Sequence, residues 1–173
     1  MNKIDEISKE FYGQYGLAMH YVHIIETGLL ELYALKMYLI KNLSEIEYYK
    51  ILSNPEKLTL GQINNKLFGL SFLEKEIKEN LIKANKTRIF LAHRFWWERE
   101  ILFDEPSELL LLHNELFKHI DLFKKILVYI DDSLKKLRFE NNLSIEEKMG
   151  LTDFKAREKF IKSLLKTSVK QKQ

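Results

Sequence analysis

The stretch that decides the fold runs from Pro106 to Glu140 and reads PSELLLLHNELFKHIDLFKKILVYIDDSLKKLRFE. Pro is favoured in the first turn of a helix, where its missing N–H is not needed. Behind it, apolar residues recur at alternating steps of three and four, the period of one helix face. They are Leu109, Leu112, Leu116, Ile120, Phe123, Leu127, Ile130, Leu134 and Leu137. This stripe predicts a long core helix of a bundle, ending at Asn141 and Asn142.

A second long helix is predicted near the N-terminus, from about Ile4 to Asn42. Its apolar residues recur every seven positions, as expected for a long buried helix. They are Ile4, Phe11, Ala18, Ile25, Leu32 and Leu39. Gly13, Gly16 and Gly28 weaken this helix locally, each by up to ~1 kcal/mol relative to Ala. A kink or a break inside it is therefore an open alternative.

Capping residues predict two short helices after the N-terminal one. Ser44 is a favourable N-cap for a helix over residues 45–52, and Glu47 completes the Ser-x-x-Glu pattern of a capping box. Thr59 opens a second short helix that continues to about Phe68.

A third long helix is predicted from just after Ser71 to about Phe103, with Glu74 placed for another capping box. Together with the other two long helices it frames a single helical bundle, to which the short helices are added. The predicted fold class is therefore all-α.

The composition agrees with an all-α fold and excludes several classes of protein. Among 173 residues there are only six Gly and two Pro, too few for the many tight turns of an all-β fold. The absence of Cys excludes disulfide scaffolds, thiol nucleophiles and Cys-ligated metals. No targeting signal and no apolar run of membrane-spanning length are found, so a cytoplasmic location without membrane contact is expected.

The charge is concentrated at the C-terminus. Thr152–Gln173 holds seven Lys and Arg against two acidic residues, a net charge of +5, whereas the whole chain carries +3. We therefore divide the chain into a helical bundle over residues 1–150 and a basic C-terminal helix and tail over 151–173. Its basic residues are candidate phosphate contacts. They include Lys155, Arg157, Lys159, Lys162 and Lys166. The alternative is a solvated amphipathic helix that frays into a tail.

Arg88 breaks the pattern of the third long helix. On a helical wheel it falls in the middle of the apolar stripe. A guanidinium that points toward the packed side is costly unless it is paired or lines a cavity. Arg88 is therefore either part of a functional cleft or neutralised structurally, by Glu26 or Glu31 of the N-terminal helix or at a homodimer seam.

The face beside Arg88 carries further polar and aromatic residues. Asn85, Trp96 and Glu100 fall there on the wheel, with His93 next to them, and they are candidates for an auxiliary cleft. Trp96 and Trp97 can stack on bases, but neighbouring side chains on a helix point ~100° apart. One of the two is therefore expected in the core and the other at an interface.

Other possible sites carry weaker signals. His20, His23 and Glu26 recur at steps of three and could present one face to a metal ion, the alternative being surface histidines. His113 lies on the apolar stripe described first and is predicted to be a hydrogen-bonded core residue, whereas His119 is predicted to be exposed. Motifs of NTPases, serine hydrolases and zinc proteases do not occur, and no cofactor or metal is predicted.

Arg88, four intervening residues and His93, in the context RIFLAHRF, resemble the Arg-x(4–6)-His motif of the HEPN superfamily (higher eukaryotes and prokaryotes nucleotide-binding domains). The preceding Leu58–Ile63, LTLGQI, and the helix order also resemble uncharacterised bacterial members, over about residues 1–140. The resemblance implies a metal-independent endoribonuclease whose two protomers pack their motif helices around a composite cleft. It further implies His93 as general acid or base and Arg88 as the group that stabilises the charged transition state.

Two hypotheses follow from this resemblance. The first is a HEPN-like homodimer that acts on RNA in a toxin–antitoxin or phage-defence system, with an antitoxin protein as a possible partner. The second is a non-catalytic helical module whose Arg/His cleft binds a nucleotide, an RNA or a partner protein. The family usually has a polar residue, often Asn, directly after the motif Arg, and Ile89 at this position favours the second hypothesis. Asn85, one turn earlier, is a candidate to supply the missing amide.

Overall fold

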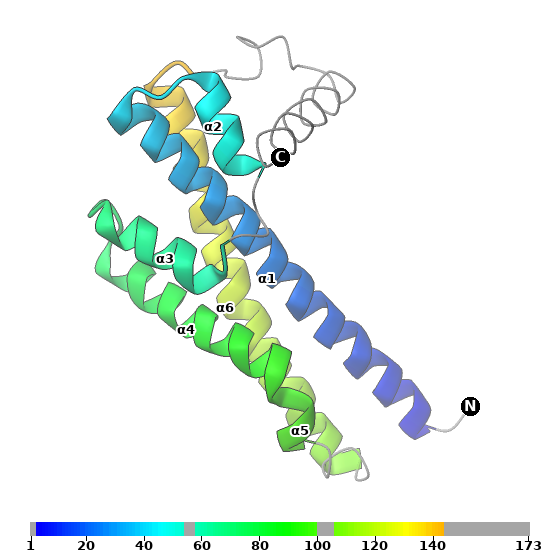
Figure 1. The fold of residues 1–173 in the computed structure, drawn as a ribbon. Helices are drawn as coiled ribbons and strands as arrows, with labels where there is room; N and C mark the ends of the chain where they lie inside the picture. The colour runs from blue at the N-terminus through cyan, green and yellow to red at the C-terminus, as the bar shows by residue number, and fades with distance from the viewer. Residues whose placement is uncertain (1–2, 54–57, 100–105, 144–173) are drawn as a thin grey trace, which may run out of the picture.

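The computed structural model describes residues 3–53, 58–99 and 106–143, and within these ranges the regular structure is entirely α-helical (Figure 1). The predicted all-α fold class is therefore confirmed. The helices are α1 (Lys3–Lys41), α2 (Glu45–Leu52), α3 (Leu60–Gly69), α4 (Lys75–His93), α5 (Phe95–Arg99) and α6 (Pro106–Glu140).

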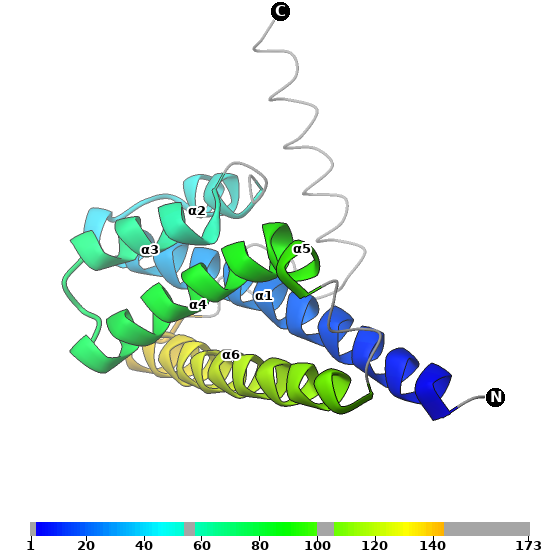
Figure 2. The same cartoon turned by 90° about the horizontal axis from the view of Figure 1, so that it is seen from below.

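The two longest helices, α1 and α6, lie side by side and run in the same direction (Figures 1 and 2). At one end the ring of His113 contacts the carbonyl oxygen of Ile7. At the other end the guanidinium of Arg138 donates to the Glu31 carboxylate. α4 runs in the opposite direction across this pair, α3 packs beside α4, and α2 folds back on the end of α1.

The predicted stripe of α6 forms much of the core. Of its nine apolar residues, all except Leu127 are buried, and Ile126 takes the inner position instead. His113 is buried on the same stripe, and its ring nitrogens lie 2.9 Å from Gln14 Oε1 and 3.2 Å from the Ile7 carbonyl oxygen. The prediction of a hydrogen-bonded core histidine is confirmed.

Local capping explains where the short helices begin. Ser44 and Glu47 form the predicted reciprocal capping box at α2, in which the Ser44 N–H donates to Glu47 Oε2 over 2.9 Å. These hydrogen bonds from Ser44 lower the pKa of the Glu47 carboxyl. Thr59 caps α3 in the same way, and Gln62 supplies the returning carbonyl group at 2.8 Å.

Both long helices end on an asparagine in the left-handed conformation. Asn42 follows α1 with φ of 51°, and Asn142 follows α6 with φ of 47°. In each case the next N–H reaches back to a carbonyl of the last turn, Leu43 to Tyr38 over 3.2 Å and Leu143 to Arg138 over 2.9 Å. This arrangement satisfies backbone groups that a helix end leaves open, and it confirms both predicted helix ends.

The third long helix is shorter than predicted. Ser71 adopts a φ of 55°, so α4 starts only at Lys75, and its N-cap Glu74 makes no side-chain capping bond. The helix then stops at His93 instead of continuing to about Phe103. The Leu91 carbonyl, which accepts from residue 95 in an uninterrupted helix, accepts from the Tyr15 hydroxyl of α1 over 2.8 Å.

One further prediction concerns membrane insertion, and several others fall on residues outside the described ranges. Within the described part of the chain, no helix combines the length and apolarity needed to cross a bilayer. Glu100, the predicted domain boundary at residue 150 and the basic residues from Lys155 to Lys166 lie outside the described residues.

The glycines of α1 do not interrupt it, and one of them allows the close contact with α6. A Cβ atom built on Gly28 would lie 2.9 Å from Cγ2 of Ile130, which is buried on α6. Gly13 and Gly16 have nothing within 4 Å of such an atom. Gly28 is therefore required by packing, whereas the other two positions have open space.

We expect Gly28→Ala and Gly13→Ala to change stability in opposite directions. Ala at position 28 must displace Ile130 and should lower the free energy of unfolding by about 1–3 kcal/mol. Ala at position 13 gains helix propensity without a clash and should raise it by about 0.5–1 kcal/mol. Urea titration of both variants measures this difference. Equal stability of Gly28→Ala and the wild type would show that the helix contact tolerates a wider spacing.

Candidate functional site

Arg88 points from α4 toward α1, where it meets Glu26. Its Nε lies 3.5 Å from Glu26 Oε1, and the two side chains are 27% and 23% exposed. Neither of these two atoms has a hydrogen-bond partner among the described residues. Glu31, the other candidate partner, pairs with Arg138 instead. Within one chain, Arg88 is therefore neutralised by a carboxylate of the bundle.

His93 lies on the other side of the same helix end. It is the last residue of α4 and is exposed, and no hydrogen bond or ion pair joins it to Arg88 in the described part of the chain. The chain turns at Arg94, whose φ of −124° and ψ of −25° depart from helical values. The motif is thus divided between a partly buried arginine and an exposed histidine at a corner.

The residues predicted for an auxiliary cleft pack on different elements. The Asn85 amide lies against α3, because a Cβ atom on Gly61 would be 3.1 Å from its Nδ2. Trp96 is half-buried and contacts Tyr15 of α1 and stacks with Tyr12, at ring distances of 4.8 and 5.4 Å. These contacts make Trp96 part of the packing between α1 and α5.

Trp97 differs from its neighbour. Its side chain is 84% exposed, the value expected for an indole that the bundle does not use for packing. Trp96 packs against the core, as predicted for one of the two tryptophans, and the interface predicted for the other stays a prediction.

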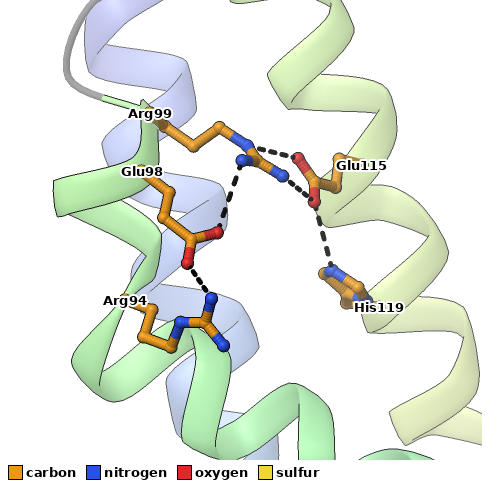
Figure 3. A network of polar contacts seen from close by, with 5 residues as sticks. All are labelled: Arg94, Glu98, Arg99, Glu115 and His119. Carbon is orange, nitrogen blue, oxygen red and sulfur yellow. Dashed lines mark hydrogen bonds and ion pairs between the residues drawn. The ribbon is translucent and has the colours of Figure 1, made fainter.

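A network of charged side chains holds the corner after His93 against α6 (Figure 3). The Arg99 guanidinium donates two hydrogen bonds to the Glu115 carboxylate, of 3.2 Å from Nε and 3.0 Å from Nη2. Glu98 accepts from Arg94 and also faces Arg99 at 3.8 Å. Since Arg99 belongs to α5 and Glu115 to α6, this two-pronged contact fixes one helix on the other.

His119 completes the network. The prediction that its side chain is exposed is wrong. Its side chain is 22% exposed, and its Nε2 lies 4.0 Å from Glu115 Oε1. Burial lowers the pKa of His119 below its ordinary value of 6.5, the Glu115 carboxylate opposes this shift, and the Arg99 guanidinium adds to it. The hydrogen bond to Glu115 raises the pKa of Arg99. Two arginines and two glutamates thus alternate along a chain of contacts that ends at His119 (Figure 3).

Sequence reasoning missed this network because its central contact is not local. Glu98 follows Arg94 by four residues and His119 follows Glu115 by four, and both spacings are recognisable on a helix. The bond from Arg99 to Glu115 joins two helices, and nothing in the spacing of sixteen residues predicts it.

Neither the predicted metal ligands of α1 nor the cavity between α1 and α6 forms a site together with Arg88 and His93. His20 and His23 are exposed while Glu26 faces Arg88, and no group of three possible metal ligands occurs among the described residues. A cavity of about 360 Å³ lies between α1, α6 and the segment before α4. Its lining carries charges of both signs, and the Lys36 ammonium already lies over the Phe72 ring at 4.5 Å.

We expect Arg88→Met to lower the free energy of unfolding by about 1–3 kcal/mol, between the effects typical of exposed and of buried ion pairs. The loss arises because Glu26 is left partly buried without its cation. The double variant Arg88→Met/Glu26→Leu should recover most of the loss, since no unpaired charge remains. Lys86→Met, on the exposed side of α4, is the control. If Arg88→Met unfolds like this control, the pair does not stabilise the bundle.

We expect the stability of the protein to fall as the pH drops below about 6.5. A histidine whose pKa is lower in the folded than in the unfolded state binds its proton preferentially after unfolding, so acid favours the unfolded chain. His119→Gln should flatten the slope of unfolding free energy between pH 7 and pH 5. His20→Gln, at an exposed position of α1, should leave it unchanged. An unaltered slope in His119→Gln would assign the pH dependence to other groups.

No family model, no curated protein and no solved structure matches this chain. The function is therefore argued from the residues themselves and from the resemblance of their motif.

Proposed function

We propose that this protein acts on RNA as a HEPN-like protein and that the corner after His93 contacts the RNA. The observation that supports this most directly is the exposure of three side chains within five residues. His93 is exposed, the Arg94 side chain is 67% exposed, and the Trp97 indole is nearly free of the bundle. The hydrogen bonds between Arg99 and Glu115 hold the corner that displays them.

These three side chains match the chemistry of RNA. An imidazole can take a proton from a ribose 2′-hydroxyl or return one to the leaving oxygen. A guanidinium binds phosphate oxygens and stabilises the charge of the transition state. An exposed indole stacks on a base. In a single chain, Arg94 is the more exposed guanidinium, at 67% against 27% for Arg88, and each of the two pairs with a carboxylate, Glu98 and Glu26 respectively.

The first candidate activity is metal-independent cleavage of RNA. The family resemblance adds a homodimer, a composite cleft with Arg88 and His93, and a toxin–antitoxin or phage-defence setting in the cytoplasm. An antitoxin protein would be the partner in such a setting. When this cleft forms, the Arg88 guanidinium leaves the Glu26 carboxylate and binds an RNA phosphate instead.

The second candidate is RNA or nucleotide binding without cleavage. The ion pair between Arg88 and Glu26 favours it, because a guanidinium engaged with a carboxylate is not free to stabilise a transition state. The exposed, apolar Ile89 next to Arg88 favours it as well. Under this proposal Trp97 and Arg94 carry the affinity, and His93 is a contact residue.

The test is cleavage of total RNA by the purified protein in EDTA. We expect the wild type to cut and His93→Ala to lose at least about 100-fold in rate, the usual share of a general acid or base. His20→Ala, which removes another exposed histidine, should cut at the wild-type rate. All variants are first compared by circular dichroism and by molar mass in solution.

The result also separates the two candidates. If the folded wild type does not cut while it retards RNA on a gel, and Trp97→Ala weakens this binding, the non-catalytic function is supported. If His93→Ala and His20→Ala cut as fast as the wild type, the histidine has no role in cleavage. A protein that does not cut RNA and binds neither RNA nor nucleotides overturns both candidates.

A further inference from the structure

The outer face of α6 carries apolar side chains that no described helix covers. Leu110, Phe117, Val128 and Phe139 are between 49% and 86% exposed. They are separated by 7, 11 and 11 residues, spacings that bring them back within about 40° of one another on a helix. We call these four residues the outer stripe.

The outer stripe lies opposite the core. At about 100° per residue, it is roughly 150° away from the buried stripe of α6. α1 and α4 lie on one side of α6, and no described helix lies on the opposite side (Figure 2). The four side chains lie ~10–17 Å apart along the helix, and exposed charged residues, among them Asp121 and Lys124, stand between them on the same face.

We infer that the outer stripe binds a second copy of this chain, with the two α6 helices antiparallel about a two-fold axis near residues 123 and 124. The stripe is close to symmetric about this point. Leu110 and Phe139 lie on opposite sides at similar distances, and so do Phe117 and Val128. The mismatch is about two residues, or ~3 Å along the helix. Each apolar residue therefore meets an apolar residue of the other copy, as an isologous interface requires.

The charges near the axis fit the same arrangement. Asp121 and Lys124 lie on the outer side of α6, both are exposed, and among the described residues neither has an ion-pair partner. In the antiparallel pair, Asp121 of each copy faces Lys124 of the other. A parallel pair would place Asp121 against Asp121 and Lys124 against Lys124, which is repulsive. The charge pattern therefore selects the antiparallel orientation.

The length of the stripe suits a helix–helix interface. Thirty residues of helix extend ~45 Å, and stable interfaces bury ~1,200–2,000 Å² in total. Exposed Leu, Val and Phe from each copy would form apolar contacts on both sides of the charged pairs at the axis. This second copy is a different arrangement from the composite cleft of the proposed function and does not depend on RNA activity. It sets the two copies of Glu115, and with them the corners beside His93, ~25 Å apart along the helix axis.

The absence of Cys allows a direct test by disulfide trapping. Lys124→Cys lies almost on the axis and should cross-link to the same residue of the second copy under mild oxidation. Phe117→Cys alone should not, because its two copies are ~20 Å apart, but a mixture of Phe117→Cys and Val128→Cys should. Ile89→Cys, exposed on α4, is the control and should remain a monomer on a non-reducing gel. Cross-linking of Ile89→Cys without Lys124→Cys would overturn the inference in favour of pairing through α4.

Mass measurements and charge reversal provide a second test. We expect the wild type to be a dimer by light scattering, Val128→Glu a folded monomer and Ile89→Glu a dimer. Asp121→Lys or Lys124→Asp alone should weaken dimerisation about tenfold, and the double reversal should restore it. A chain that is monomeric at every concentration overturns the inference. So does a Val128→Glu variant that loses stability without changing its mass, which would show that the chain covers the stripe itself.

Discussion

The contact between α1 and α6 is the most extensive contact between two helices in the described part of the chain. It depends on Gly28, whose missing side chain lets the backbone of α1 approach Ile130. Polar contacts at both ends set the register of the pair, with His113 near Gln14 and Arg138 bound to Glu31. Because the register is fixed, Glu26 and Tyr15 of α1 face α4 at defined heights.

Those two residues of α1 divide the motif. Glu26 draws Arg88 toward the bundle, whereas Tyr15 occupies the Leu91 carbonyl where α4 comes to its end. Arg99 then binds Glu115 and fixes α5 on α6. A helix continued past His93 would have carried the histidine and both tryptophans along one straight axis. The corner instead buries Phe95, packs Trp96 and leaves Trp97 exposed.

The sequence predicted what is determined locally and failed where distant contacts decide. The stripe of α6, the capping box of α2 and the asparagine helix ends depend on neighbours within about two turns, and they were predicted correctly. Where α4 ends, the Leu91 carbonyl accepts from Tyr15, 76 residues away, a contact that no local signal marks. His119 packs beside the Phe90 ring of α4 at 6.4 Å, a contact between two helices that no local spacing predicts. The helical wheel predicted that the Arg88 side chain points toward the core. Which carboxylate it meets, Glu26 and not Glu31, depends on how α1, α4 and α6 pack.

The division of the motif has a consequence for how two copies could share a site. Arg88 already has a counter-ion within its own chain, so a second copy is not needed to neutralise it. A composite cleft must break that contact, and the cost of separating a partly buried pair must be recovered from RNA phosphate. A dimer through the outer stripe leaves the pair intact and keeps the two corners apart, so each corner would have to bind RNA by itself. The strength of the Glu26–Arg88 pair therefore decides between one shared site and two separate ones.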